Sequence, residues 1–64
     1  MLLKDFFQSG ICSGCLSAII YSDKWDGEET FLLGGEYPSV WTVSTAPVLS
    51  YNILADIVRI KIKQ

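Results

Sequence analysis

The most regular pattern of apolar and polar positions lies near the end of the chain. There, apolar residues alternate with cationic ones: Val58, Arg59, Ile60, Lys61, Ile62 and Lys63. A period of two residues is that of a β-strand with one face buried and the other in water. Residues 16–21 show the same period, with Leu16, Ala18 and Ile20 on one side and Ile19 and Tyr21 on the other. Both segments are therefore predicted to be strands.

The middle of the chain is divided by turn signals. Asp26-Gly27 is a strong hairpin turn signal between two apolar runs, so residues 30–33 are predicted to return as a second strand. Residues 39–45 are rich in Val, Thr and Trp and predict a third strand, which Pro38 precedes at a position where a missing N–H is tolerated.

The first residues repeat at helical rather than strand spacing. The apolar members of this repeat are Leu2, Leu3, Phe6 and Phe7, and Gly10 stands where a helix would be capped. The predicted helix is too short to be stable alone and must dock on the rest of the chain. Residues 46–55 allow either a short helix, capped by Thr45 with Pro47 in its first turn, or a loop.

These elements predict one α+β domain over residues 1–64. Its expected architecture is a short N-terminal helix packed on a small antiparallel sheet of about four strands. A small, partly open β-barrel is the alternative. A chain of 64 residues leaves no room for a second hydrophobic core.

Composition adds an expectation of self-association. Half of the residues are hydrophobic, and three Phe, three Tyr and two Trp are among them. So small a domain cannot readily enclose that much apolar surface. We therefore expect a protein partner, and a homo-oligomer is the simplest one.

Charge and residue types narrow the function classes. The formal net charge is −2 and histidine is absent, which argues against a polyanion-binding domain and leaves a weak nucleic-acid binder as a minor alternative. Without an imidazole, and with little room for a cleft, we expect neither an enzyme nor a cofactor. No export signal and no membrane span can be read, so the expected location is the cytoplasm.

Two charged segments are candidate partner-binding surfaces. The first is the acidic hairpin tip with Asp23, Trp25, Asp26, Glu28 and Glu29, and the second is the basic strand with Arg59 and Lys61. In the tip, Trp25 is either an interface anchor surrounded by charge or a ring that folds back over the core. The basic strand is either a partner surface or a solvated face on which lysines discourage aggregation.

Cys12 and Cys15 form the sharpest local motif, Cys-Ser-Gly-Cys. A redox site would need a helix to follow the motif, and a zinc site would need four ligands. We therefore predict two reduced cysteines in a Gly/Ser turn and no metal. A zinc ion shared by two chains, or a reversible disulfide, is the alternative.

The chain has Leu-Leu-Lys-Asp-Phe-Phe near its start and the strand Ile-Val-Arg-Ile-Lys-Ile-Lys near its end. In these two segments and in its overall style, it resembles small accessory proteins of phages and mobile elements. Anti-CRISPR proteins belong to that group. The expected location is therefore the host cytoplasm if the chain is phage-encoded. The resemblance implies a non-enzymatic inhibitor that sterically blocks a larger host defence complex, and it carries over no functional residue. A structural subunit of a larger assembly is the other alternative.

Overall fold

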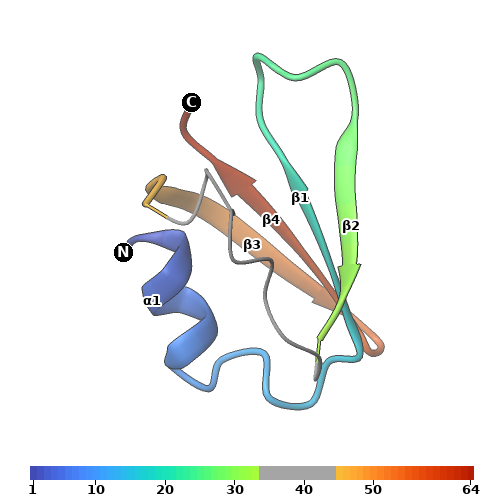
Figure 1. The fold of residues 1–64 in the computed structure, drawn as a ribbon. Coiled ribbons are helices and arrows are strands. Elements are labelled where there is room, and N and C mark those ends of the chain that lie inside the picture. The colour runs from blue at the N-terminus through green and yellow to red at the C-terminus, as the bar shows by residue number, and fades with distance from the viewer. Residues whose placement is uncertain (34–44) are drawn as a thin grey trace.

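The chain forms one short helix and four strands, shown in Figure 1 for a computed structural model that describes residues 1–33 and 45–64. The elements are α1 (Leu3–Gln8), β1 (Ser17–Tyr21), β2 (Glu28–Leu32), β3 (Val48–Leu54) and β4 (Ile57–Ile62). The strands form one sheet in the order β2-β1-β4-β3. The sheet is not closed into a barrel, so the prediction of an α+β fold with a helix on a four-stranded sheet is confirmed.

The sheet is mixed, however, and the prediction of an all-antiparallel sheet was wrong at its centre. β1 and β2 form one antiparallel hairpin, β3 and β4 form another, and β1 pairs with β4 in parallel. This arrangement places β1 and β4, which supply the buried strand residues, in the middle. The central positions are the ones in which a strand loses most contact with water.

The prediction of a helix or loop at residues 46–55 was also wrong, because most of this segment is the edge strand β3. Tyr51 pairs with Ile60 and Asn52 with Arg59. A two-residue connection then leads from Leu54 to Ile57. Pairing with a strongly patterned neighbour overrides the weak local preference of the segment. The predicted strand at 39–45 lies outside the described residues except for Thr45, which lies in a turn.

One face of the sheet carries the core, and α1 lies over it. Leu3 and Phe6 of the helix are fully buried together with five strand residues, Ala18, Ile20, Val58, Ile60 and Ile62. The faces predicted for both alternating segments are therefore confirmed, except that Leu16, which precedes β1, is exposed. In the part of the chain that the structure describes, no helix is long and apolar enough to cross a membrane.

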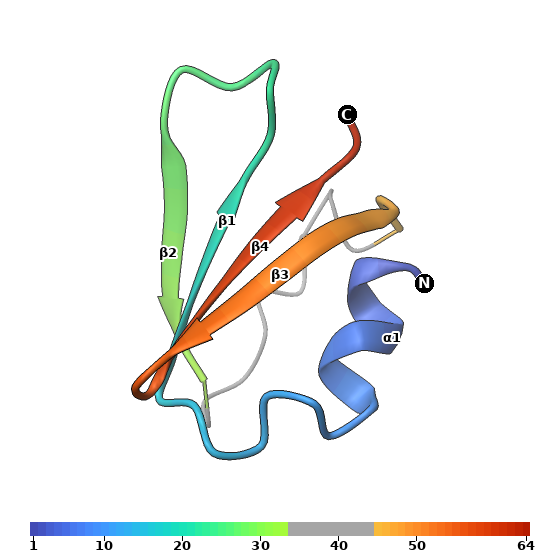
Figure 2. The same cartoon turned by 180° about the vertical axis from the view of Figure 1, so that it is seen from behind.

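The helix is held beside β3 by backbone hydrogen bonds. The N–H of Leu3 donates to the carbonyl of Ala46 (2.9 Å), and the N–H of Val48 donates to the carbonyl of Met1 (2.8 Å). Both views of the fold place α1 near β3 and far from β2 (Figures 1 and 2). At its end, Gly10 adopts a φ of +83°, as the sequence predicted for a residue that caps a helix C-terminus.

Candidate functional site

The face of the sheet opposite α1, which we call the outer face, is built from three rows of side chains that cross all four strands. At the end near the β3–β4 turn lies the apolar row: Leu32, Ser17, Ile57 and Leu54. The middle row follows: Thr30, Ile19, Arg59 and Asn52. The charged row is next to the hairpin tip: Glu28, Tyr21, Lys61 and Ser50.

The apolar row is open to solvent at its ends. Leu32 is 79% exposed, Leu54 60% and Ile57 36%. Single exposed apolar residues are common on soluble proteins, whereas neighbouring ones are typical of an interaction surface. Here Leu54 and Ile57 are paired, and Ser17 separates them from Leu32. No local sequence pattern predicts this row, because its members come from four strands and become neighbours only in the folded sheet.

The acidic hairpin tip and the basic strand, predicted as two separate surfaces, lie together on the outer face. Arg59 Nη2 donates to Glu28 Oε1 at 2.6 Å, and Lys61 Nζ lies 3.1 Å from Asp23 Oδ1. The Arg59 guanidinium also lies over the ring of Tyr21, 5.0 Å from its centroid. Arg59 and Lys61 thus each have an acidic partner, which reduces the electrostatic field that they offer to an outside polyanion.

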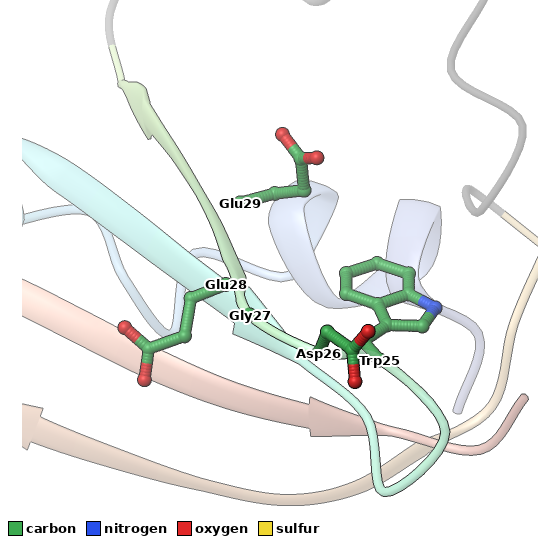
Figure 3. A pocket seen from close by; sticks show the side chains of 5 residues that line it. All are labelled: Trp25, Asp26, Gly27, Glu28 and Glu29. Carbon is green, nitrogen blue, oxygen red and sulfur yellow. The ribbon is translucent and has the colours of Figure 1, made fainter.

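The hairpin tip forms a shallow hollow of about 380 Å³ lined by Trp25, Asp26, Gly27, Glu28 and Glu29. Figure 3 shows the side chains of Glu28 and Glu29 pointing to opposite sides of β2. This follows from the alternation of a strand, because Glu28 is opposite Tyr21 on the outer face and Glu29 is opposite the buried Ile20. Their carboxylates therefore do not converge on one ligand.

Trp25 turns back towards the core. Its ring is half-buried and packs against the core cluster, and its indole Nε1–H donates to Gln64 Oε1 at 2.7 Å. The tight turn before it is closed by Ser22, whose carbonyl accepts from the Trp25 N–H at 3.1 Å and whose hydroxyl accepts from the Lys24 N–H at 3.3 Å. The exposed part of the ring remains available as the predicted anchor, beside exposed Asp26.

Cys12 and Cys15 are both buried at the edge of the core and are not linked to each other. They lie in one turn, in which the Cys15 N–H donates to the Cys12 carbonyl at 3.0 Å. Burial raises the pKa of the Cys12 thiol above the ordinary 9.0, and the neighbouring Cys15 adds to the rise. A thiol that stays protonated at neutral pH is a poor nucleophile and a poor metal ligand. Within residues 1–33 and 45–64, no group of three or more His, Cys, Asp or Glu side chains could hold a metal ion.

The fold and this site define a small α+β domain in which a helix covers one face of the sheet and no described helix or strand covers the other. No family model, curated protein or solved structure matches the chain.

Proposed function

We propose that this chain is a non-enzymatic protein-binding module that meets its partner with the outer face of its sheet. The observation that carries the proposal is the apolar row, in which the exposed residues Leu32, Leu54 and Ile57 share one face of the sheet. Protein interfaces combine an apolar centre with a polar rim that is less desolvated. The ion pairs of Arg59 and Lys61 supply such a rim at the other end of the same face.

The predicted partner-binding residues fit this proposal unequally. Asp23, Glu28, Arg59 and Lys61 belong to the rim, whereas Glu29 points towards the other side of β2. In the rim, their role is to orient a partner and to set the association rate. The main contribution to affinity comes from desolvating the apolar row.

A nucleic-acid-binding role is less well supported. Binding to phosphates scales with the cations that are free to replace counterions. Arg59 and Lys61 each already contact a carboxylate, at 2.6 Å and 3.1 Å. Phosphates would have to displace Glu28 and Asp23 before these two cations could contribute.

The finer proposal is a phage-encoded, anti-CRISPR-like inhibitor that acts by steric blocking. It is based on the resemblance of the chain's two ends, and the open face supplies a surface suited to blocking. The direct test is target-DNA cleavage by a CRISPR effector complex with and without the purified protein. Inhibition that is lost with the outer-face variant described next would support this role, and cleavage unaffected by the wild-type protein would contradict it for the complex tested.

Affinity capture from host lysate, read by mass spectrometry, tests the binding proposal with matched variants. The double variant Leu32→Glu/Leu54→Glu places charges at both ends of the apolar row. The control is Leu16→Glu, the same change at a residue of similar exposure that lies outside the row and outside β3. We expect the wild type and the control to retain a common partner that the double variant loses. A partner retained equally by all three would overturn the assignment to the outer face.

A further inference from the structure

The sheet has two edges, and they differ in how well they are protected from pairing with another chain. Edge strands usually carry charges that prevent such pairing. The edge strand β2 includes Glu28 and Glu29, whereas the edge strand β3 (Val48–Leu54) has no charged residue. Six of the seven β3 residues are exposed.

Among residues 1–33 and 45–64, the chain's own backbone covers the beginning of the β3 edge. Leu2 bridges to Pro47 and the Met1 carbonyl accepts from the Val48 N–H, and the register then shifts between Val48 and Ser50. From Ser50 to Leu54 the strand is regular and Asn52 is its middle residue. Because hydrogen bonds alternate along an antiparallel ladder that closes on a two-residue turn, Tyr51 and Ile53 direct their N–H and C=O groups away from β4.

The surface beside this edge is apolar and hollow. A depression of about 400 Å³ lies between α1 and β3, lined mainly by Met1, Phe6, Ile11, Val48, Leu49 and Tyr51. The ring of Tyr51 is 48% exposed although it packs edge-on against buried Phe6, with 5.0 Å between the centroids. The apolar hollow therefore lies along the same edge to which Tyr51 and Ile53 direct their backbone groups.

We propose that β3 pairs antiparallel with β3 of a second copy of this chain, which joins the two sheets across a two-fold axis at Asn52. This register places Tyr51 opposite Ile53 of the second copy, an aromatic–aliphatic pair that stabilises sheets. A two-fold interface brings identical surfaces together, so an uncharged strand can pair with itself, whereas β2 would bring its glutamates close to one another.

A standard interface buries about 800 Å² on each partner, which is roughly a fifth of this chain's 4297 Å². If each copy also covers the hollow of the other, the dimer would shield the exposed residues Met1, Leu49 and Ile53 from water. The outer face remains free, so this proposal stands independently of the partner proposed above.

Thr30 and Asn52 provide a matched test, because they lie at opposite ends of the same row and on the same face. We expect wild-type protein to dimerise in sedimentation-velocity runs in the micromolar range. Asn52→Glu should raise the dimer dissociation constant at least about tenfold, because two carboxylates then oppose each other. Within one chain the new Glu faces Arg59, so the fold should be retained. Thr30→Glu should dimerise like the wild type.

Disulfide cross-linking provides a second measurement that does not depend on the Asn52→Glu variant folding. Asn52→Cys should form a covalent dimer in oxidised glutathione, because the two thiols face each other across the axis, whereas Thr30→Cys should not. A wild-type chain that stays monomeric into the high micromolar range would overturn the proposal. So would equal dimerisation of the two Glu variants, or equal cross-linking of the two Cys variants.

Discussion

Arg59 of β4 reaches across the central strand β1 to Glu28 of β2, with Nη2 and Oε1 2.6 Å apart. On the way its guanidinium passes over the ring of Tyr21. This contact joins residues 31 positions apart in the chain and places the acidic hairpin tip next to the basic strand. The charge segregation seen along the sequence is thus largely cancelled within the fold.

Breaking this ion pair should cost little stability, because both side chains are 43% exposed. Glu28→Gln should lower the free energy of unfolding by less than about 1 kcal/mol, as for other surface pairs. Urea unfolding at low and high salt measures the effect, which should shrink as salt screens the pair. Glu29→Gln is the control, since Glu29 is a neighbouring carboxylate on the other face of β2. A loss of several kcal/mol in Glu28→Gln alone would contradict the surface-pair interpretation.

Trp25 is expected to contribute to folding as well as to any interface. Trp25→Ala removes a half-buried ring that packs against the core and donates to Gln64. It should therefore cost about 2 kcal/mol of unfolding free energy, less than a fully buried aromatic would cost. Gln64→Ala, which removes only the exposed hydrogen bond, should cost less than about 1 kcal/mol. Unchanged stability of Trp25→Ala in chemical denaturation would identify the ring as purely an interface residue.

The Cys12 thiol should make stability depend on alkaline pH. Its pKa is raised in the folded state by burial and by Cys15, so the folded protein holds this proton more tightly than the unfolded chain does. The resulting stability is fully present below pH 9.0, the ordinary pKa of the thiol, and is lost as the pH rises through the folded-state value. Cys12→Ala should lose stability at neutral pH through the smaller side chain, but its stability should decline less between neutral and alkaline pH. Parallel pH profiles for the two proteins would contradict this prediction.

The same burial predicts slow chemical modification. Iodoacetamide at neutral pH should alkylate Cys12 more slowly in the native protein than in urea, because the reactive thiolate is scarce and the side chain is 7% exposed. Stoichiometric zinc in the purified protein, measured by mass spectrometry of metals, would reverse this interpretation and favour a metal shared between two chains.

Ala55 should be a site at which glycine stabilises the protein. It begins the turn between β3 and β4 with a φ of +56°, in the left-handed region that costs an L-residue about 1 kcal/mol. Ala55→Gly should raise the unfolding free energy by up to about 1 kcal/mol, partly offset by the greater freedom of glycine in the unfolded chain. Ala55→Val should lower it, because a branched side chain tolerates this conformation less well. A destabilising glycine would show that the turn relaxes without strain.

Two kinds of element were readable from the sequence. The alternation around Arg59 and Lys61 predicted β4 and its wet face, and the helical spacing of Leu3 and Phe6 predicted α1. In each of these elements, buried side chains recur with the period of the helix or strand. The apolar pattern of one segment is therefore enough to predict the element. The hairpin tip at Asp26-Gly27 is local in the same sense, since a tight turn depends on its own residues.

Strand β3 shows what local pattern cannot decide. Its segment Val48–Leu54 does alternate, with Leu49, Tyr51 and Ile53 apolar and Ser50 and Asn52 polar, but it is mostly exposed. It becomes a strand because β4 provides backbone partners. The parallel pairing of β1 with β4, the apolar row and the contact between Arg59 and Glu28 likewise depend on strand order. The sequence by itself determined the elements in which buried residues recur at a regular spacing along one segment. The tertiary structure decided every feature made by residues from several strands, because hydrogen bonding between strands sets which side chains become neighbours.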